Sequence, residues 1–143
     1  MINFYSEDVP LPPIVEENVG AWIKACVQAF AQTEVEEVSV VFCSDEYLLE
    51  MNRTHLNHDY YTDIITFEYS SKPVAGDLFI STDRVADNAT KLEVDIKEEL
   101  HRVIIHGVLH LIGYKDKTEP ESKEMREMEN RALEMYVSRG TNS

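Results

Sequence analysis

The chain has 143 residues, an apolar content of 43% and a formal net charge of −14 at pH 7. This length and composition predict a single folded domain spanning residues 1–143, with a hydrophobic core of its own. The acidic balance argues against broad electrostatic binding of nucleic acid, because phosphate binding normally rests on clustered lysine and arginine. It does not exclude a local basic patch.

The sequence carries no recognisable secretory or membrane-spanning signal. Its N-terminal stretch, MINFYSEDVP, has no basic segment, and no run of about 18 apolar residues occurs anywhere in the chain. The two cysteines, Cys26 and Cys43, are too few for a disulfide framework or a cysteine-based zinc site. We therefore expect a reduced, soluble, cytoplasmic protein with no membrane partner. The oligomeric state stays open.

The N-terminal half alternates strand and helix patterns. Residues 2–5 read as a short edge strand, and residues 14–32 carry apolar side chains at helical spacing. The β-branched run 38–43 predicts a buried strand. A helix then extends to about residue 54, with Ser44 or Asp45 as its N-cap.

The remaining elements are two strands followed by helices. The strands are expected at residues 63–69 and 77–81, with a turn at residues 72–76 between them. Helices are expected at residues 82–92, at residues 95–112 ending at Gly113, and after a capping box formed by Thr118 and Glu121. This order predicts an α+β fold, in which a mixed four-stranded sheet is packed with helices.

The helix at residues 95–112 is apolar around most of its circumference, which is typical of a buried helix. Its polar side chains form a narrow stripe that contains Glu99, His106 and His110. The two histidines are four residues apart, so their Cβ atoms lie roughly 6 Å apart on one face and both rings can reach one metal ion.

The stretch HGVLHLIGYKD, residues 106–116, adds a third candidate ligand. The helix ends at Gly113, and the short segment after it lets Asp116 fold back toward the histidines. Two imidazoles and one carboxylate suit zinc and leave a fourth position for water, as in catalytic sites. The alternative is two core histidines bonded to carbonyl groups or to Glu99, although Glu99 itself is expected to be a surface carboxylate.

The stretch differs from the HExxH motif of metalloproteases at the position of the general base, where Gly107 stands. Peptide hydrolysis is therefore a minor candidate. A glycine here instead allows another backbone or a substrate to approach the helix closely.

HGVLHLIGYKD resembles the signature of the YbeY family of metal-dependent endoribonucleases, H-G-x-L-H-L-x-G-Y-D-H. Two upstream segments are also similar to that family, MNRTHLNHDYYTDIITF at residues 51–67 and GDLFIS at residues 76–81. The resemblance implies an α+β fold with a zinc-like ion held by three ligands beside a cleft. It also implies cleavage of single-stranded RNA, maturation of small-subunit ribosomal RNA and ribosome quality control, with ribosomal RNA and the small ribosomal subunit as partners.

Carried over by position, the resemblance makes His106 and His110 metal ligands, and it places Asp116 where the family has a third histidine. A carboxylate is an acceptable zinc ligand. A second departure is Leu56, which stands where the family usually has an arginine thought to be important for activity, and leucine cannot bind phosphate. The candidates to replace that arginine are Arg53, His58 and Lys115, of which we take His58 and Lys115 as the catalytic candidates.

The sequence thus predicts a metal-dependent endoribonuclease with zinc held by His106, His110 and Asp116. The first alternative is a ribosome-assembly factor that keeps a structural metal site and has little nuclease activity, which the missing arginine and the acidic charge favour. A metallohydrolase acting on peptides or small molecules is the other.

Overall fold

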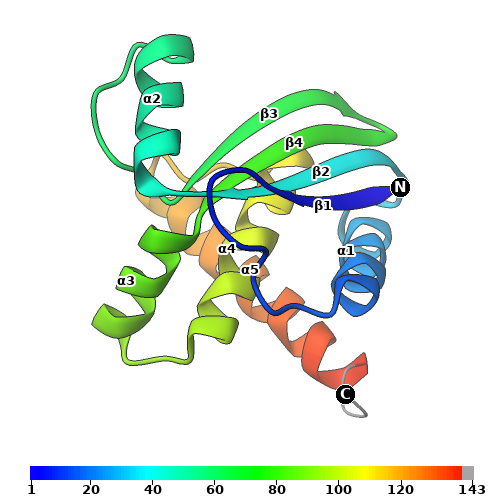
Figure 1. Cartoon of the computed structure of the whole chain (residues 1–143). Helices are drawn as coiled ribbons and strands as arrows, with labels where there is room; N and C mark the ends of the chain where they lie inside the picture. The colour runs from blue at the N-terminus through cyan, green and yellow to red at the C-terminus, as the bar shows by residue number, and fades with distance from the viewer. Residues whose placement is uncertain (140–143) are drawn as a thin grey trace.

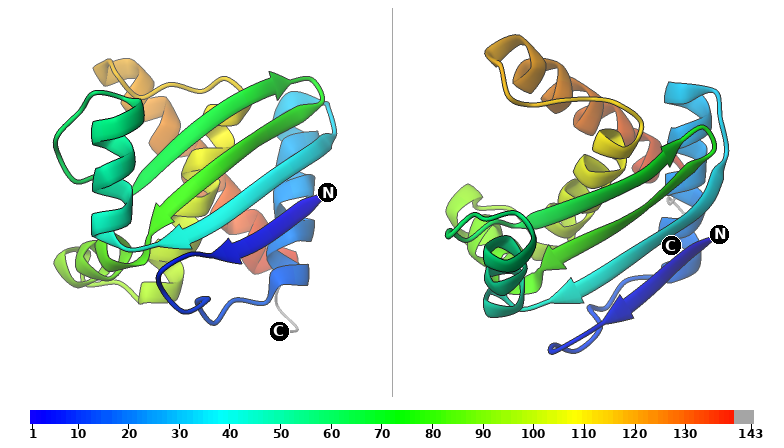
Figure 2. Two further views of the ribbon diagram at one scale, coloured as in Figure 1. Left: turned by 45° about the horizontal axis from the view of Figure 1, so that its top comes forward. Right: turned by 90° about the horizontal axis from the view of Figure 1, so that it is seen from above.

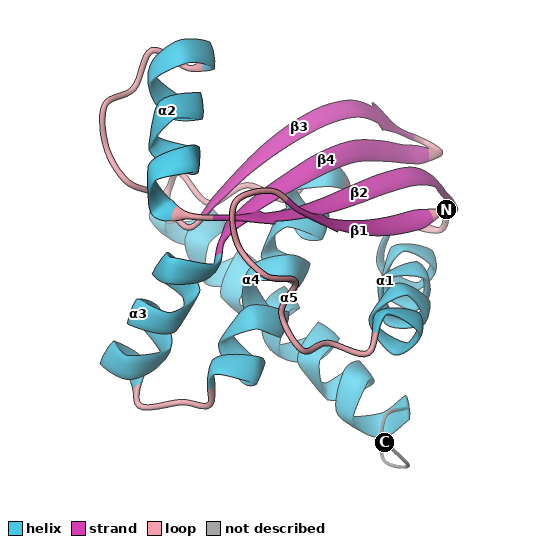
Figure 3. Ribbon diagram, in the orientation of Figure 1, coloured by secondary structure: helices cyan, strands magenta, loops and turns pink. Residues whose placement is uncertain are grey.

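The computed structural model describes the backbone of residues 1–139 and the side chains of residues 1–136. In chain order the elements are β1 (Ile2–Ser6), α1 (Glu16–Ala31), β2 (Val35–Cys43), α2 (Asp45–His55), β3 (Ile64–Ser71), β4 (Val74–Ser81), α3 (Thr82–Leu92), α4 (Ile96–Leu111) and α5 (Glu119–Arg139). Figures 1 and 3 show the strands side by side, with helices packed around them.

The four strands form one mixed sheet in the order β1-β2-β4-β3. β1 pairs with β2 and β2 pairs with β4 in parallel, whereas β3 and β4 form an antiparallel hairpin. The two views of Figure 2 place α1, α4 and α5 on one side of this twisted sheet. The predicted α+β fold with a mixed four-stranded sheet is therefore confirmed.

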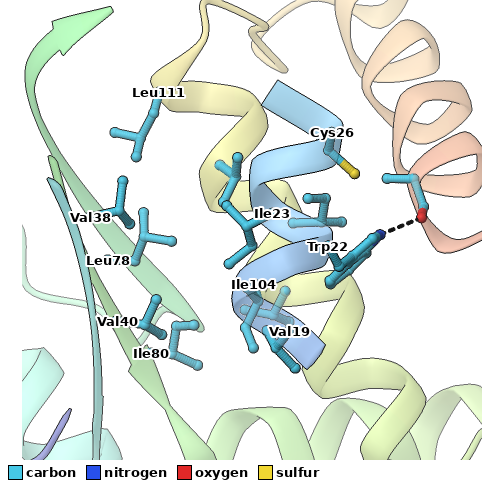
Figure 4. Close-up of a cluster of buried hydrophobic side chains, with 14 of the residues drawn as sticks. Val19, Trp22, Ile23, Cys26, Val38, Val40, Leu78, Ile80, Ile104 and Leu111 are labelled. Atoms are coloured by element: carbon cyan, nitrogen blue, oxygen red, sulfur yellow. Dashed lines mark hydrogen bonds between the residues drawn. The ribbon is translucent and has the colours of Figure 1, made fainter. Parts of the chain in front are cut away.

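The main hydrophobic core lies between the sheet and these three helices. Figure 4 shows side chains of β2 and β4, such as Val40 and Leu78, facing Ile23 of α1 and Ile104 of α4. The indole Nε1 of Trp22 donates a hydrogen bond of 2.7 Å to the Ala132 carbonyl oxygen. This bond satisfies the one polar atom of a fully buried side chain and ties α1 to α5.

A smaller cluster joins α2 to the sheet. Leu48 of α2 is buried with Cys43 and Ile65, and Phe67 and Phe79 pack against this group. Because neighbouring residues of a strand point to opposite faces, β4 contributes Leu78 and Ile80 to the main core and Phe79 to this cluster.

α4 is the central helix, and Gly107 sets how closely the sheet approaches it. A Cβ atom added at Gly107 would lie 2.6 Å from Ile64 Cδ1 and 2.9 Å from Leu78 Cδ2. The close approach expected at this glycine is therefore made by side chains of β3 and β4, not by a second backbone or a substrate.

The ends of the helices follow the capping rules. Ser44 accepts from Tyr47 N at 3.1 Å, and Asp95 accepts from Lys97 N at 3.0 Å. Gly113 follows α4 with φ of 110°, a conformation that favours glycine. The capping box is also present, since Glu121 N donates to Thr118 Oγ1 at 3.2 Å and Thr118 N donates to Glu121 Oε1 at 3.0 Å.

Two strands begin three residues earlier than expected. β2 begins at Val35, and β4 begins at Val74, inside the segment 72–76 expected to be a turn. The turn between β3 and β4 is shorter than its glycine and proline residues suggest. The reason is that cross-strand pairing extends the ladder to Val74 opposite Ser71. Within the described part of the chain, no helix has the length and apolar character needed to cross a membrane.

Candidate metal centre

Three side chains meet where α4 ends. His106 and His110 point from the last turns of α4, and Asp116 lies in the segment between α4 and α5. The Nε2 atoms of the two histidines are 3.1 Å apart, and Asp116 Oδ2 lies 3.2 Å from His106 Nε2 and 3.5 Å from His110 Nε2. In the described part of the chain, these three residues form the group of histidine, cysteine or acidic side chains that could hold one ion. Their donor atoms all lie within 4.8 Å of one another.

The triangle of these three atoms has the dimensions of one face of a zinc site. Donor atoms about 2.0–2.1 Å from zinc at tetrahedral angles lie about 3.3 Å from one another. The observed separations of 3.1, 3.2 and 3.5 Å bracket that value. The two nitrogens and one oxygen therefore fit a tetrahedral ion that keeps a fourth position for water or substrate.

Glu129 of α5 holds the His106 ring from behind. Its Oε2 accepts from His106 Nδ1 at 2.6 Å, and only 5% of Glu129 is exposed. Because a carboxylate only accepts, Nδ1 carries the hydrogen and the Nε2 lone pair of the neutral ring is available to a metal. Arg102 Nη1 donates to Glu129 Oε1 at 3.1 Å, so this buried carboxylate is bonded through both oxygens.

The pKa values of this pair follow from their contact. Burial lowers the pKa of His106, but the hydrogen bond and charge of Glu129, together with Asp116, outweigh burial and the pKa is raised. Burial raises the pKa of Glu129, but His106 and Arg102 outweigh it and the pKa is lowered. The surroundings thus favour a positive charge at the His106 ring.

Glu129 and Arg102 were not among the candidates from the sequence. A signal for Glu129 exists, because it interrupts the apolar face of α5 between Met125 and Ala132, which are both buried. Arg102 lies on the same stripe of α4 as Glu99 and His106. Only the packing of α5 on α4 shows that the two side chains meet.

The expectation that Glu99 is a surface carboxylate was wrong. Glu99 is 4% exposed, because the neighbouring helices cover this part of α4. It does not hydrogen-bond the histidines either, and its Oε1 has no hydrogen-bond partner. Burial raises its pKa, although Arg102 acts in the opposite direction.

The three candidate donor atoms of His106, His110 and Asp116 are here called the metal-ligand triangle, and a cavity opens on each side of it. The first, here called the Glu99 cavity, reaches His106, and its other charged lining residues are Asp63, Glu99, Arg102, Asp116, Arg126 and Glu129. The second, here called the Lys115 cavity, is lined by Glu68, His110, Gly113, Tyr114, Lys115, Asp116 and Lys117. Asp116 borders both cavities, so the triangle lies between them.

The two catalytic candidates lie differently. Lys115 is exposed and lines its cavity together with His110 and Asp116. His58 lies in the loop after α2, where its Nδ1 is 2.9 Å from the Tyr60 hydroxyl and its ring stacks on that tyrosine. His58 lines neither of the two cavities.

The position of the missing arginine is also visible. Leu56 is the C-cap of α2 and is 40% exposed. Arg53 Nε donates to Asp59 Oδ1 at 2.6 Å, so the charge of this nearby arginine already has a partner.

Comparison with known proteins identifies the family of the chain. The family model described as "Endoribonuclease YbeY" matches residues 2–137. The chain belongs to the YbeY family. The resemblance seen in HGVLHLIGYKD is therefore confirmed.

YbeY relatives with this name cover nearly the whole chain. The Endoribonuclease YbeY of Parabacteroides distasonis is 51% identical over 133 residues, which are 92% of this chain and 93% of the relative. That of Porphyromonas gingivalis is 50% identical over 135 residues, covering 94% and 89%. The solution structure of TM1509 from Thermotoga maritima has a TM-score of 0.72 at 27% identity, and the match covers 99% of this chain and 93% of that one.

Proposed function

We propose that this protein is a metal-dependent endoribonuclease that cleaves single-stranded RNA, with one divalent ion, zinc, held by His106, His110 and Asp116. The observation that carries the proposal is the triangle of donor atoms 3.1–3.5 Å apart in a chain of the YbeY family. The relatives are named endoribonucleases, which supports nuclease activity over the alternative of a ribosome-assembly factor whose metal site is only structural.

The ion, when bound, supplies a Lewis acid for a phosphate oxygen and lowers the pKa of a bound water. The residues of the chain would bind the ion and orient its ligands. Glu129 fixes the tautomer and plane of His106, and Arg102 fixes Glu129. Asp116 contributes a negative charge where a histidine would be neutral, which reduces the net positive charge of the site.

Lys115 and His58 are proposed to replace the family arginine at Leu56. Lys115 shares a cavity with His110 and Asp116, so its ammonium group can bind a phosphate of the substrate beside the ligands. His58 stacks on Tyr60, and Tyr60 is 55% exposed, so this loop presents an imidazole and an aromatic ring on the surface.

The proposed substrate is small-subunit ribosomal RNA in the cytoplasm, and the proposed roles are its maturation and ribosome quality control. A peptide substrate is disfavoured because Gly107, at the position of the HExxH base, packs against Ile64 and Leu78. Lys115 and Lys117 place two ammonium groups in one cavity, beside the carboxylates of Glu68 and Asp116, and these ammonium groups can contact the phosphates of an RNA strand.

The test combines metal content and RNA cleavage. Elemental analysis of the purified protein should find about one divalent ion per chain, and His106→Ala and Asp116→Ala should each lose most of it. Metal-loaded protein should cleave a single-stranded RNA oligonucleotide, whereas chelated protein and His110→Ala should not. Full metal occupancy in both ligand variants would contradict the proposal. So would an RNA cleavage rate that is the same in metal-loaded and chelated protein.

The catalytic candidates need separate variants. Lys115→Ala and His58→Ala should keep the metal and lower the cleavage rate, whereas Lys123→Ala, an exposed lysine of α5 that lines neither cavity, should not. If one of these two variants cleaves RNA at the rate of the unchanged protein, the substituted residue is not catalytic.

A further inference from the structure

Glu99 is a buried acid whose carboxyl group accepts no hydrogen bond from the rest of the described chain. It is 4% exposed, and its Oε1 has no hydrogen-bond partner. Arg102 Nε forms a long ion pair with Glu99 Oε1 at 4.0 Å, which is beyond hydrogen-bond length. Arg102 is instead bonded through Nη1 to Glu129 and Asn130. A buried acceptor without a donor is costly to the fold.

This carboxyl group lines the cavity that reaches His106 and Asp116. The volume of the Glu99 cavity is about 270 Å³, close to the lower end of the range of sites for small organic ligands, roughly 300–1,000 Å³. Leu92, Val103 and Met125 add apolar surface to its lining. The Glu99 carboxyl group lies among charged and polar side chains, with these three apolar residues beside them. The cavity therefore offers a hydrogen-bond acceptor for the edge of an unpaired base and apolar surface for its faces.

We propose that the Glu99 cavity is a nucleobase subsite that accepts the Watson–Crick edge of guanine from the RNA strand crossing the metal centre. The inference rests on the proposed function, because it takes RNA as the ligand. Guanine presents N1–H and an exocyclic amino group side by side, and one carboxylate accepts both. Uracil presents its single N3–H between two carbonyl oxygens, which a carboxylate repels.

A second metal ion is a weaker explanation of this acidic cavity. Asp63 and Glu99 both line it, but the described group whose donor atoms lie within 4.8 Å of one another consists of His106, His110 and Asp116. A hydrogen-bonding organic ligand needs one correctly placed carboxylate, whereas a cation needs several converging oxygens.

The direct test is nucleotide binding. Calorimetry of the metal-loaded protein with guanosine 5′-monophosphate and uridine 5′-monophosphate should show about tenfold tighter binding of the guanosine nucleotide. Any contact of the phosphate with the ion is common to both nucleotides and cancels in the ratio. Equal affinity of the unchanged protein for the two nucleotides overturns the proposal, whatever the variants do.

Two matched variants assign the preference to one residue. Glu99→Gln replaces one acceptor oxygen with a donor and should reduce the preference to about twofold or less. Glu98→Gln makes the same change on an exposed neighbour in the same helix and should keep the full ratio. A preference that persists in Glu99→Gln, or is lost equally in Glu98→Gln, contradicts the assignment.

The same samples separate this inference from the proposed function. His110 does not line the Glu99 cavity, so His110→Ala should abolish RNA cleavage and keep the preference for guanosine. RNA cleavage that survives in His110→Ala contradicts the proposed function and leaves the nucleotide ratio as an independent result.

Discussion

Glu129 Oε2 accepts a hydrogen bond of 2.6 Å from His106 Nδ1, across the interface between α5 and α4. The two residues are far apart in sequence, so this contact exists only because α5 packs on the polar stripe of α4. It makes the metal-ligand triangle depend on a helix that supplies none of its three donor atoms.

Glu129→Gln should weaken metal binding about 10–100-fold without removing it. The amide keeps the shape of the side chain but loses the negative charge that favours Nδ1–H and a basic Nε2. A competition titration with a metal chelator measures the change. Glu127→Gln, which alters an exposed acid of the same helix, should bind metal as the unchanged protein does. Equal affinity in both variants would show that Glu129 does not support the site.

Asp116→His should keep the metal, because it restores the third histidine of the family motif at a residue whose carboxylate Oδ2 lies 3.2 and 3.5 Å from the other two donor atoms. Asp116→Ala should lose most of it, because two imidazoles alone leave two positions to water. Metal content after dialysis against a weak chelator distinguishes the two. Similar loss in both variants would mean that the segment after α4 does not bring residue 116 to the ion.

Gly107→Ala should destabilise the protein by about 1–3 kcal/mol, because the new methyl group would lie 2.6 Å from Ile64 Cδ1 and 2.9 Å from Leu78 Cδ2. Urea unfolding at a fixed, metal-free condition gives the free energy of unfolding.

Gly20→Ala is the matched control for that substitution. Gly20 lies within α1, and a Cβ atom there would meet nothing within 4 Å. The change should therefore raise the free energy of unfolding by about 0.5–1 kcal/mol through helix propensity. Equal effects of the two substitutions would contradict the tight packing of α4 on the sheet.

His101 should make the protein less stable in mild acid. Its ring packs against Trp22 and Tyr136, and burial lowers its pKa to about 4, with a further contribution from Lys97. Between about pH 6.5 and pH 4 the unfolded chain binds a proton that the folded chain excludes, so stability falls as the pH falls through this range. The contribution of this group between pH 7 and pH 5 is about 2 kcal/mol.

His101→Phe should therefore lose about 2 kcal/mol less stability than the unchanged protein when metal-free samples are unfolded in urea at pH 7 and at pH 5. His55→Phe makes the same substitution on an exposed residue and should follow the unchanged protein. The same pH dependence in His101→Phe and the unchanged protein would show that His101 does not exclude the proton.

Local sequence patterns predicted most of the elements and brought out the three candidate donor residues. Signals at helix ends act within a few residues of chain, so they can be predicted before the fold is known. Examples are Ser44, the capping box at Thr118 and Gly113. Patterns of that range could not predict that Glu99 is buried or that β4 starts at Val74, because both depend on neighbours distant in the sequence.

The sequence by itself determined the buried character of α4, the spacing of His106 and His110 on one face, and the carboxylate at position 116. Only the tertiary structure decided which groups surround them. Glu129 reaches His106, and Glu99 is left without a hydrogen-bond partner, because α5 covers the polar stripe of α4 from across the core. The reason is physical: a helix pattern defines a face from local periodicity, whereas the partners of that face depend on how separate helices pack together.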